Sequence, residues 1–142
     1  MKVAQASDPT TELRLKSKGA VIHFDEGLIG FSECKDFVVM ENEGLAPFRL
    51  LQSVESPEVG FLVVEPTSLV NNYYERVPAR DWESIGVIGT TKLLAFAIVI
   101  IGQTPETSTG NLQAPLLVNY EKMIGKQVIL SESGYSVRHP LI

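Results

Sequence analysis

The residues best suited to chemistry in this sequence are His23, His139 and Cys34, its two histidines and its single cysteine. A Ser-His-Asp hydrolase needs a histidine held by a carboxylate beside its nucleophile, and the G-x-S-x-G motif is absent. A zinc site would need carboxylates recruited from across the fold. A reactive thiolate at Cys34 would need more nearby positive charge than Lys35 supplies. We therefore expect no catalytic residue, no metal and no cofactor.

A second stretch of possible chemical interest is GLIGF, residues 27–31. Its spaced glycines could cradle a phosphate, but the Lys-Ser/Thr of a phosphate loop is missing and two acidic residues directly precede it. What remains is a turn whose glycines permit unusual backbone angles. Its apolar side chains, Leu28, Ile29 and Phe31, would then plug or extend an apolar surface.

The acidic residues are concentrated in one part of the sequence. The chain has a net charge of −5, and residues 25–65 hold nine acidic residues against Lys35 and Arg49. Such a field repels phosphate backbones, because nucleic-acid affinity comes mostly from Lys and Arg side chains. We therefore expect no direct nucleic-acid binding. The acidic half would attract a basic protein partner, and the alternative is a surface that only keeps the chain in solution.

Short apolar runs bounded by turn residues predict a mainly β fold. The runs that we expect to form strands are 18–24, 37–41, 48–54, 59–65, 93–101, 116–119, 127–130 and 135–137. So many strands in so short a chain favour a small antiparallel β-barrel-like or sandwich domain. The continuous run 93–101 should be covered on both faces and therefore central. Pro115 cannot donate a backbone hydrogen bond, which predicts an edge or a bulge beside 116–119.

The elements that accompany these strands are few. Pro78 suits the first turn of a helix and Gly86 can end it, so we expect one or two short helices, one of them closing an end of the barrel. Residues 1–15 have no periodicity and predict a flexible tail before a single domain, 16–142.

Cysteine usage and hydropathy bear on location. One cysteine cannot form an internal disulfide, and the first residues lack the apolar core of a secretory signal. The longest apolar run falls well short of the roughly 20 residues that a membrane helix needs. We expect a cytoplasmic protein with no membrane anchor.

Four stretches, in their order and spacing, resemble the FliW family of flagellar assembly factors. They are HFDEGLIGF (23–31), FRLLQSVESPEVGFLVVEP (48–66), NLQAPLLVN (111–119) and KQVILSESGYSVRHPLI (126–142). The resemblance runs from about Gly19 to Ile142. It implies a non-catalytic β-barrel-like regulator that binds the C-terminal region of flagellin and also the basic RNA-binding translational repressor CsrA. Export of flagellin would free the protein to antagonise the repressor, and flagellin translation would resume.

Flagellin and the repressor would require different binding surfaces. An apolar, helical flagellin segment needs a hydrophobic groove, for which the candidates are Leu28, Ile29, Phe31, Tyr73 and Tyr74. Phe48 and Phe61 lie on strand runs and are expected in the core, and the two tyrosines could equally pack in a turn. Glu55 and Glu58 would attract a basic repressor. The resemblance associates the C-terminal residues Arg138, His139, Pro140 and Leu141 with repressor binding.

Two other functions stay open at this stage. One is a flagellin-specific chaperone that never binds the repressor. The other is a small-ligand barrel or enzyme, which would enclose a cavity with convergent polar groups. A polar cavity containing Gln52 or Asn119 would favour that second alternative, and a filled interior would count against it.

Overall fold

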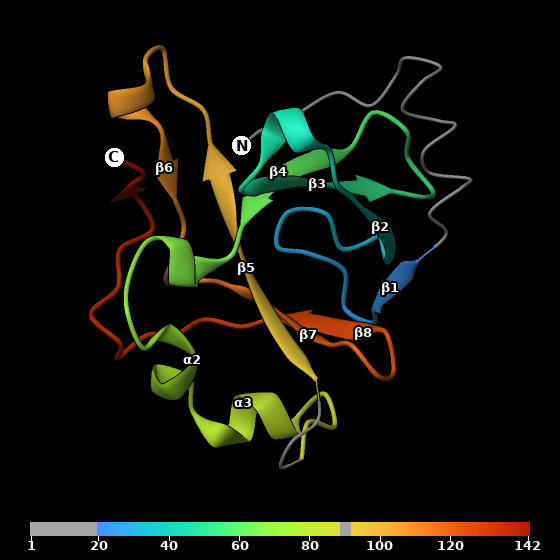
Figure 1. Ribbon diagram of the computed structural model, residues 1–142. Helices are drawn as coiled ribbons and strands as arrows, with labels where there is room; N and C mark the ends of the chain where they lie inside the picture. Colours follow the sequence, from blue (N-terminus) through green and yellow to red (C-terminus); the bar gives the residue numbers. More distant parts are fainter. Residues whose placement is uncertain (1–19, 89–91) are drawn as a thin grey trace.

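The computed structural model describes residues 20–88 and 92–142, which form a closed seven-stranded β-barrel with short helices on its outside (Figure 1). The barrel strands are β1 (Val21–Phe24), β2 (Asp36–Met40), β3 (Phe48–Ser53), β4 (Gly60–Val64), β5 (Leu93–Ile100), β7 (Leu116–Asn119) and β8 (Ile124–Gln127). Their order is β4-β3-β2-β1-β8-β7-β5, and pairing of β4 with β5 closes the ring. The mainly β, barrel-like fold expected from the sequence is confirmed.

The remaining elements are short. Two-residue strands β6 (Thr109–Gly110) and β9 (His139–Pro140) extend the sheet from the end of β5. The helices are α2 (Tyr73–Arg76) and α3 (Ala79–Glu83), with 3-10 turns η1 (Glu43–Leu45), η2 (Pro66–Ser68) and η3 (Pro105–Thr107). The prediction of one or two short helices is therefore confirmed, whereas the predicted flexible tail at 1–15 lies outside the described residues.

Strand β5 separates two hydrophobic cores. Leu94 and Phe96 point into the barrel, where they pack with the aromatic rings of the other strands. Their neighbours Ala95 and Ala97 point outward and pack against the helices. Because successive side chains of a strand face opposite sides, both faces of β5 are covered. This explains the uninterrupted apolar run and confirms its predicted central place.

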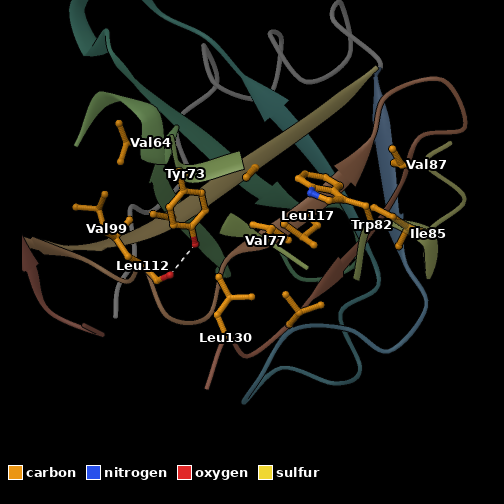
Figure 2. Close-up of a cluster of buried hydrophobic side chains, with 13 residues drawn as sticks. Val64, Tyr73, Val77, Trp82, Ile85, Val87, Val99, Leu112, Leu117 and Leu130 are labelled. Carbon is orange, nitrogen blue, oxygen red and sulfur yellow. Dashed lines mark hydrogen bonds between the residues drawn. The ribbon is translucent and has the colours of Figure 1, made fainter. Parts of the chain in front are cut away.

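The helices lie on the outer face of the barrel wall. Trp82 of α3 and Tyr73 of α2 belong to the outer core, together with Ala95 of β5 and Leu117 of β7 (Figure 2). The phenolic oxygen of Tyr73 donates to the carbonyl oxygen of Leu112 at 2.6 Å. The expectation that a helix closes an end of the barrel is therefore wrong. Small alanines on the outer face of β5 leave room for helical side chains against the wall.

Three other expectations differ from the structure. Pro115 immediately precedes β7, which pairs with both β5 and β8, so this strand is not at an edge. Strand β8 shares only Gln127 with the predicted strand 127–130, and residues 135–137 form no strand. The barrel is not wholly antiparallel, since β1 pairs with β8 in parallel. These features depend on pairing between distant segments, which local sequence patterns do not encode.

Candidate partner-binding site

The GLIGF stretch forms a tight turn at one end of the barrel. Leu28 and Phe31 exchange backbone hydrogen bonds of 2.7 and 3.3 Å across Ile29 and Gly30. Gly30 has φ +86°, which fits the third position of a type II turn. The prediction of a shaped turn is therefore confirmed. Ile29 at its tip is 61% exposed, whereas Leu28 is only 2% exposed and packs in the barrel core.

Gln127, the last residue of β8, fixes the tip of this turn. Its side-chain carbonyl oxygen accepts the backbone N–H of Ile29 at 2.8 Å. Its amide nitrogen donates to the backbone carbonyl of Ala114 at 3.0 Å. One side chain therefore connects the turn to the segment before β7. The sequence analysis missed Gln127, because nothing in its local pattern reveals a partner 98 residues away.

A hollow of about 450 Å³ opens beside the turn, and its lining is mostly apolar. The apolar residues are Ile29, Phe31, Phe61, Ile98, Ile100, Ala114 and Val137, and the polar or charged ones are Thr109, Asn111, Gln127 and Arg138. We call this the apolar hollow. Ile29, Ile100 and Val137 expose 61%, 41% and 45% of their surface. Exposed apolar side chains gathered around a depression are typical of protein-binding surfaces.

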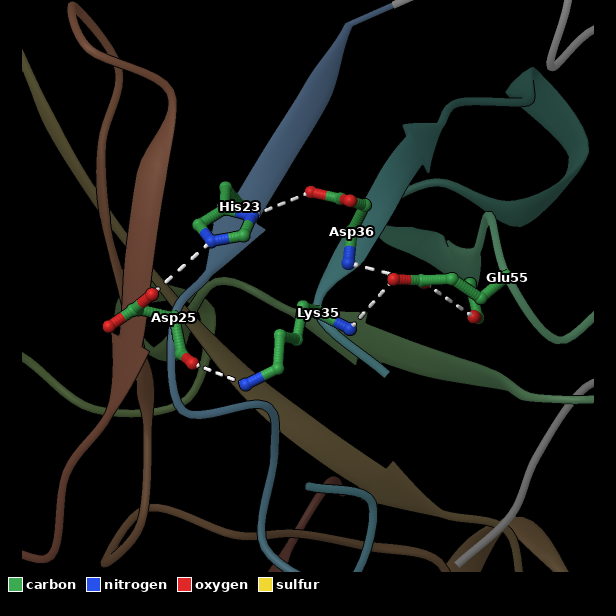
Figure 3. A network of polar contacts seen from close by, with 6 residues as sticks. His23, Asp25, Lys35, Asp36 and Glu55 are labelled. Atoms are coloured by element: carbon green, nitrogen blue, oxygen red, sulfur yellow. Dashed lines mark hydrogen bonds and ion pairs between the residues drawn. The ribbon is translucent and has the colours of Figure 1, made fainter. Parts of the chain in front are cut away.

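The acidic β3–β4 connection contacts the end of the β1–β2 connection, a few residues after the GLIGF turn. The carboxylate of Glu55, between β3 and β4, accepts the backbone N–H groups of Lys35 and Asp36, each at 3.3 Å (Figure 3). The backbone N–H of Val54 also donates to the carbonyl of Asp36 at 2.9 Å. Glu58, in the same connection, is exposed. The acidic β1–β2 and β3–β4 connections therefore belong to the same end of the barrel as the apolar hollow.

The four C-terminal candidates have different surroundings. Arg138 is exposed and lines the apolar hollow. His139 and Pro140 form β9, which pairs with β6, and Leu141 packs against the outer core. Of this group, only Arg138 is therefore brought together with the GLIGF turn.

Three predicted groove residues are placed elsewhere or buried. Leu28 and Tyr73 are 2% and 0% exposed, so neither offers surface to a partner in this conformation, and we correct that expectation. Tyr74 is half-buried in the outer core, and its hydroxyl accepts the backbone N–H of Ala95 at 2.7 Å. Burial raises the pKa of Tyr74 to about 12. Their aromatic character alone did not show whether these tyrosines lie in a surface groove or in the core.

His23 and Cys34, the residues that could have done chemistry, are held by hydrogen bonds to neighbouring side chains. Nδ1 of His23 lies 2.8 Å from Asp36 and its Nε2 lies 3.5 Å from Asp25 (Figure 3). The hydrogen bond with Asp36, helped by Asp25 and opposed by burial, raises the pKa of His23. Cys34 is buried, with its thiol 3.6 Å from the hydroxyl of Ser56. In the described residues, no three His, Cys, Asp or Glu side chains are placed to hold a metal ion.

Gln52 and Asn119, which could have lined an internal cavity, hydrogen-bond to the backbone, although the side-chain oxygen of Gln52 is buried with no hydrogen-bond partner among the described residues. The amide nitrogen of Gln52 donates to three backbone carbonyls at 3.0 to 3.1 Å. Asn119 donates to the carbonyl of Ile85 at 2.9 Å and accepts two backbone N–H groups. Both lie on the outer side of the barrel wall, because their neighbours Leu51 and Val118 point into the barrel, whose interior is filled by apolar side chains. Both residues therefore organise turns and strand ends.

The comparison with family models decides the family. The model described as FliW protein matches residues 7–141, almost the whole chain. The chain belongs to the FliW family. The match begins nearer the N-terminus than the resemblance described above, which started at about residue 19. The family that the four sequence stretches indicated is confirmed.

Relatives in this FliW family agree with the assignment. The flagellar assembly factor FliW of Geobacillus kaustophilus is 33% identical over 99% of this chain and 95% of its own. That of Leptospira interrogans serovar Lai is 35% identical over 89% of this chain and 85% of its own. A crystal structure of the flagellar assembly factor FliW matches with a TM-score of 0.77 and 34% identity, covering 87% of this chain and 86% of the other.

No helix in residues 20–88 or 92–142 is long and apolar enough to cross a bilayer.

Proposed function

We propose that this FliW-family protein is a cytoplasmic regulator that binds flagellin and, when flagellin leaves, binds and antagonises the basic translational repressor CsrA. The observation that carries the proposal is the convergence of three features at one barrel end: the exposed tip of the GLIGF turn, the acidic connections and Arg138. The sequence had assigned these features to two different partners. Because they adjoin one another, a bulky partner on one obstructs the other.

The apolar hollow suits the flagellin part of this proposal. An amphipathic helix binds by placing a few apolar side chains into a groove, and such anchors supply most of the binding energy. Ile29 and Ile100 offer exposed surface at the rim, and Phe31 and Phe61 line the interior. A C-terminal flagellin segment with apolar side chains would remove this surface from water.

The acidic connections suit the repressor part. A basic partner approaching them gains favourable long-range attraction, which raises the association rate more than the final affinity. The proposal needs no direct contact with nucleic acid, since the protein would act on the repressor itself.

The test of the repressor contact is a charge reversal that leaves the fold intact. Glu58 is suitable because it is exposed, whereas Glu55 holds two backbone N–H groups and its replacement would disturb the turn. We expect Glu58→Lys to slow repressor association several-fold at low salt, with the difference shrinking at high salt. Glu83→Lys, an exposed reversal on α3, is the matched control.

The flagellin-only chaperone predicts a different result. The wild-type protein would then bind flagellin and give no complex with the repressor at any salt concentration, so Glu58→Lys would have nothing to change. If the repressor binds and both reversals have equal effects, the acidic connections are not the docking region.

A further inference from the structure

Charge is unevenly placed around the apolar hollow. Arg138 is the one charged residue in its lining. Within the described part of the chain, its side chain makes no hydrogen bond or ion pair, and its backbone N–H donates to the hydroxyl of Ser136 at 2.9 Å. An exposed guanidinium beside apolar side chains is thus available for an incoming anionic group.

The opposite charge lies in the β3–β4 connection, which directly precedes β4 and its hollow-lining residue Phe61. In Figure 1 the β3–β4 connection, which carries Glu55 and Glu58, is at the right of the molecule. Strand β6 and the C-terminus are at the left, and Arg138 directly precedes the strand that pairs with β6. A segment that crosses the apolar hollow therefore meets negative charge at one side and positive charge at the other.

We propose that the apolar hollow accepts an amphipathic protein segment in one direction, with an Asp or Glu side chain of that segment paired to Arg138. This rests on the proposed function, since the segment is the flagellin region that the hollow would bind. A guanidinium presents a planar fork of donors that matches a carboxylate with two parallel hydrogen bonds. The apolar surroundings strengthen such a pair once water has been displaced.

Charge complementarity also selects against the reverse orientation. A segment laid the other way would bring its carboxylate toward Glu58 and leave Arg138 without a partner. Like-charge approach and an unpaired guanidinium both weaken binding, which is how an interface excludes a wrong register. The apolar anchors would supply affinity, and Arg138 would supply direction.

The experiment is a charge swap measured by calorimetry with flagellin encoded by the same genome. We expect Arg138→Glu to weaken flagellin binding at least tenfold and Arg138→Lys to weaken it less, because lysine keeps the charge and loses the fork. Arg80→Glu, an equal change of charge at an exposed residue of α3 outside the apolar hollow, should bind like the wild type. Thermal unfolding checks that all three variants are folded.

The reciprocal charge reversals are then made in flagellin. Each Asp or Glu of the flagellin C-terminal region is changed to Lys in turn, and one of these variants should restore binding to Arg138→Glu while weakening binding to the wild type. If Arg138→Glu binds flagellin as the wild type does, or if no reciprocal change restores binding, the pairing is wrong. Failure of the wild type to bind flagellin at all would instead overturn the proposed function.

Discussion

The ring of Phe31 meets the ring of Phe61 edge to face, with centroids 5.2 Å apart and an interplanar angle of 81°. This contact joins the GLIGF turn to β4, and both rings also line the apolar hollow. The turn is therefore anchored by its one aromatic residue, Phe31, and by Gln127, while Ile29 projects from its tip. An exposed isoleucine on a turn held from both sides is prearranged for binding, which lowers the entropic cost of association.

The first prediction concerns that tip. Ile29→Asp should weaken flagellin binding at least tenfold, because it places a charge where an apolar anchor would be desolvated. Stability should change little, since Ile29 is 61% exposed. Ile129→Asp is the control, because Ile129 is also 61% exposed and lies outside the apolar hollow. Equal calorimetric affinities for the two variants would argue against the hollow as the flagellin site.

The second prediction concerns the support of the turn. Gln127→Ala removes hydrogen bonds to Ile29 and Ala114, and should lower the free energy of unfolding by about 1 to 2 kcal/mol. The loosened turn should also bind flagellin more weakly. Gln113→Ala, a partly buried glutamine outside the hollow lining, is the control for denaturant unfolding. Unchanged stability and affinity in Gln127→Ala would mean that the turn is held by its own backbone alone.

The third prediction compares the two glycines of the turn. Gly27 has φ +68°, and an added Cβ would come within 2.6 Å of the backbone of Ser32. Gly30 has φ +86° but open space around it. Gly27→Ala should therefore cost about 3 kcal/mol or more, from strain and clash together, and Gly30→Ala about 1 to 2 kcal/mol from strain alone. Urea unfolding of both variants tests the order, and equal losses would contradict it.

Much of the fold could be predicted because the strands carry local signals. The runs that became β3, β4 and β5 are apolar and bounded by turn residues, and their limits were predicted to within one or two residues. The parallel pairing of His23 with Ile124 carries no such signal, since the two residues are 101 positions apart and their pairing is set by closure of the barrel.

Residue type and spacing indicated the glycine turn, but they did not decide which side chains would be exposed. The three apolar residues of this turn were predicted together, but Leu28 is buried and Ile29, at the tip, is largely exposed. Tyr73 was misplaced because an aromatic side chain fits a groove or a core equally well, and here its hydroxyl has a buried carbonyl partner. Ile98 and Val137 enter the apolar hollow only through the closure of the barrel and the course of the C-terminal segment.

The fourth prediction concerns pH. The carboxylates of Asp36 and Asp25 raise the pKa of His23 above its ordinary value of 6.5. The stabilisation from these contacts is complete below about pH 6.5 and is lost as the pH rises through the higher pKa of the folded chain. Partial exposure of His23 keeps the effect modest.

Substitution of each histidine separates this effect from other titrations. The stability difference between the wild type and His23→Gln should be largest near pH 6 and smaller near pH 8, measured by denaturant unfolding. His139→Gln is the control, because Nδ1 of His139 faces a backbone carbonyl instead of a carboxylate. A stability difference for His23→Gln that does not vary with pH would show that these contacts do not depend on the histidine's charge.

The central claim is that one end of the barrel serves two partners that exclude each other. Its most direct test is to titrate flagellin into a preformed complex of this protein with CsrA, and to follow the species by size-exclusion chromatography with light scattering. Shared use of the hollow and the adjoining acidic connections predicts release of the repressor in proportion to the flagellin added, with no ternary complex. A stable ternary complex, with each partner bound as tightly as it binds alone, would contradict the account.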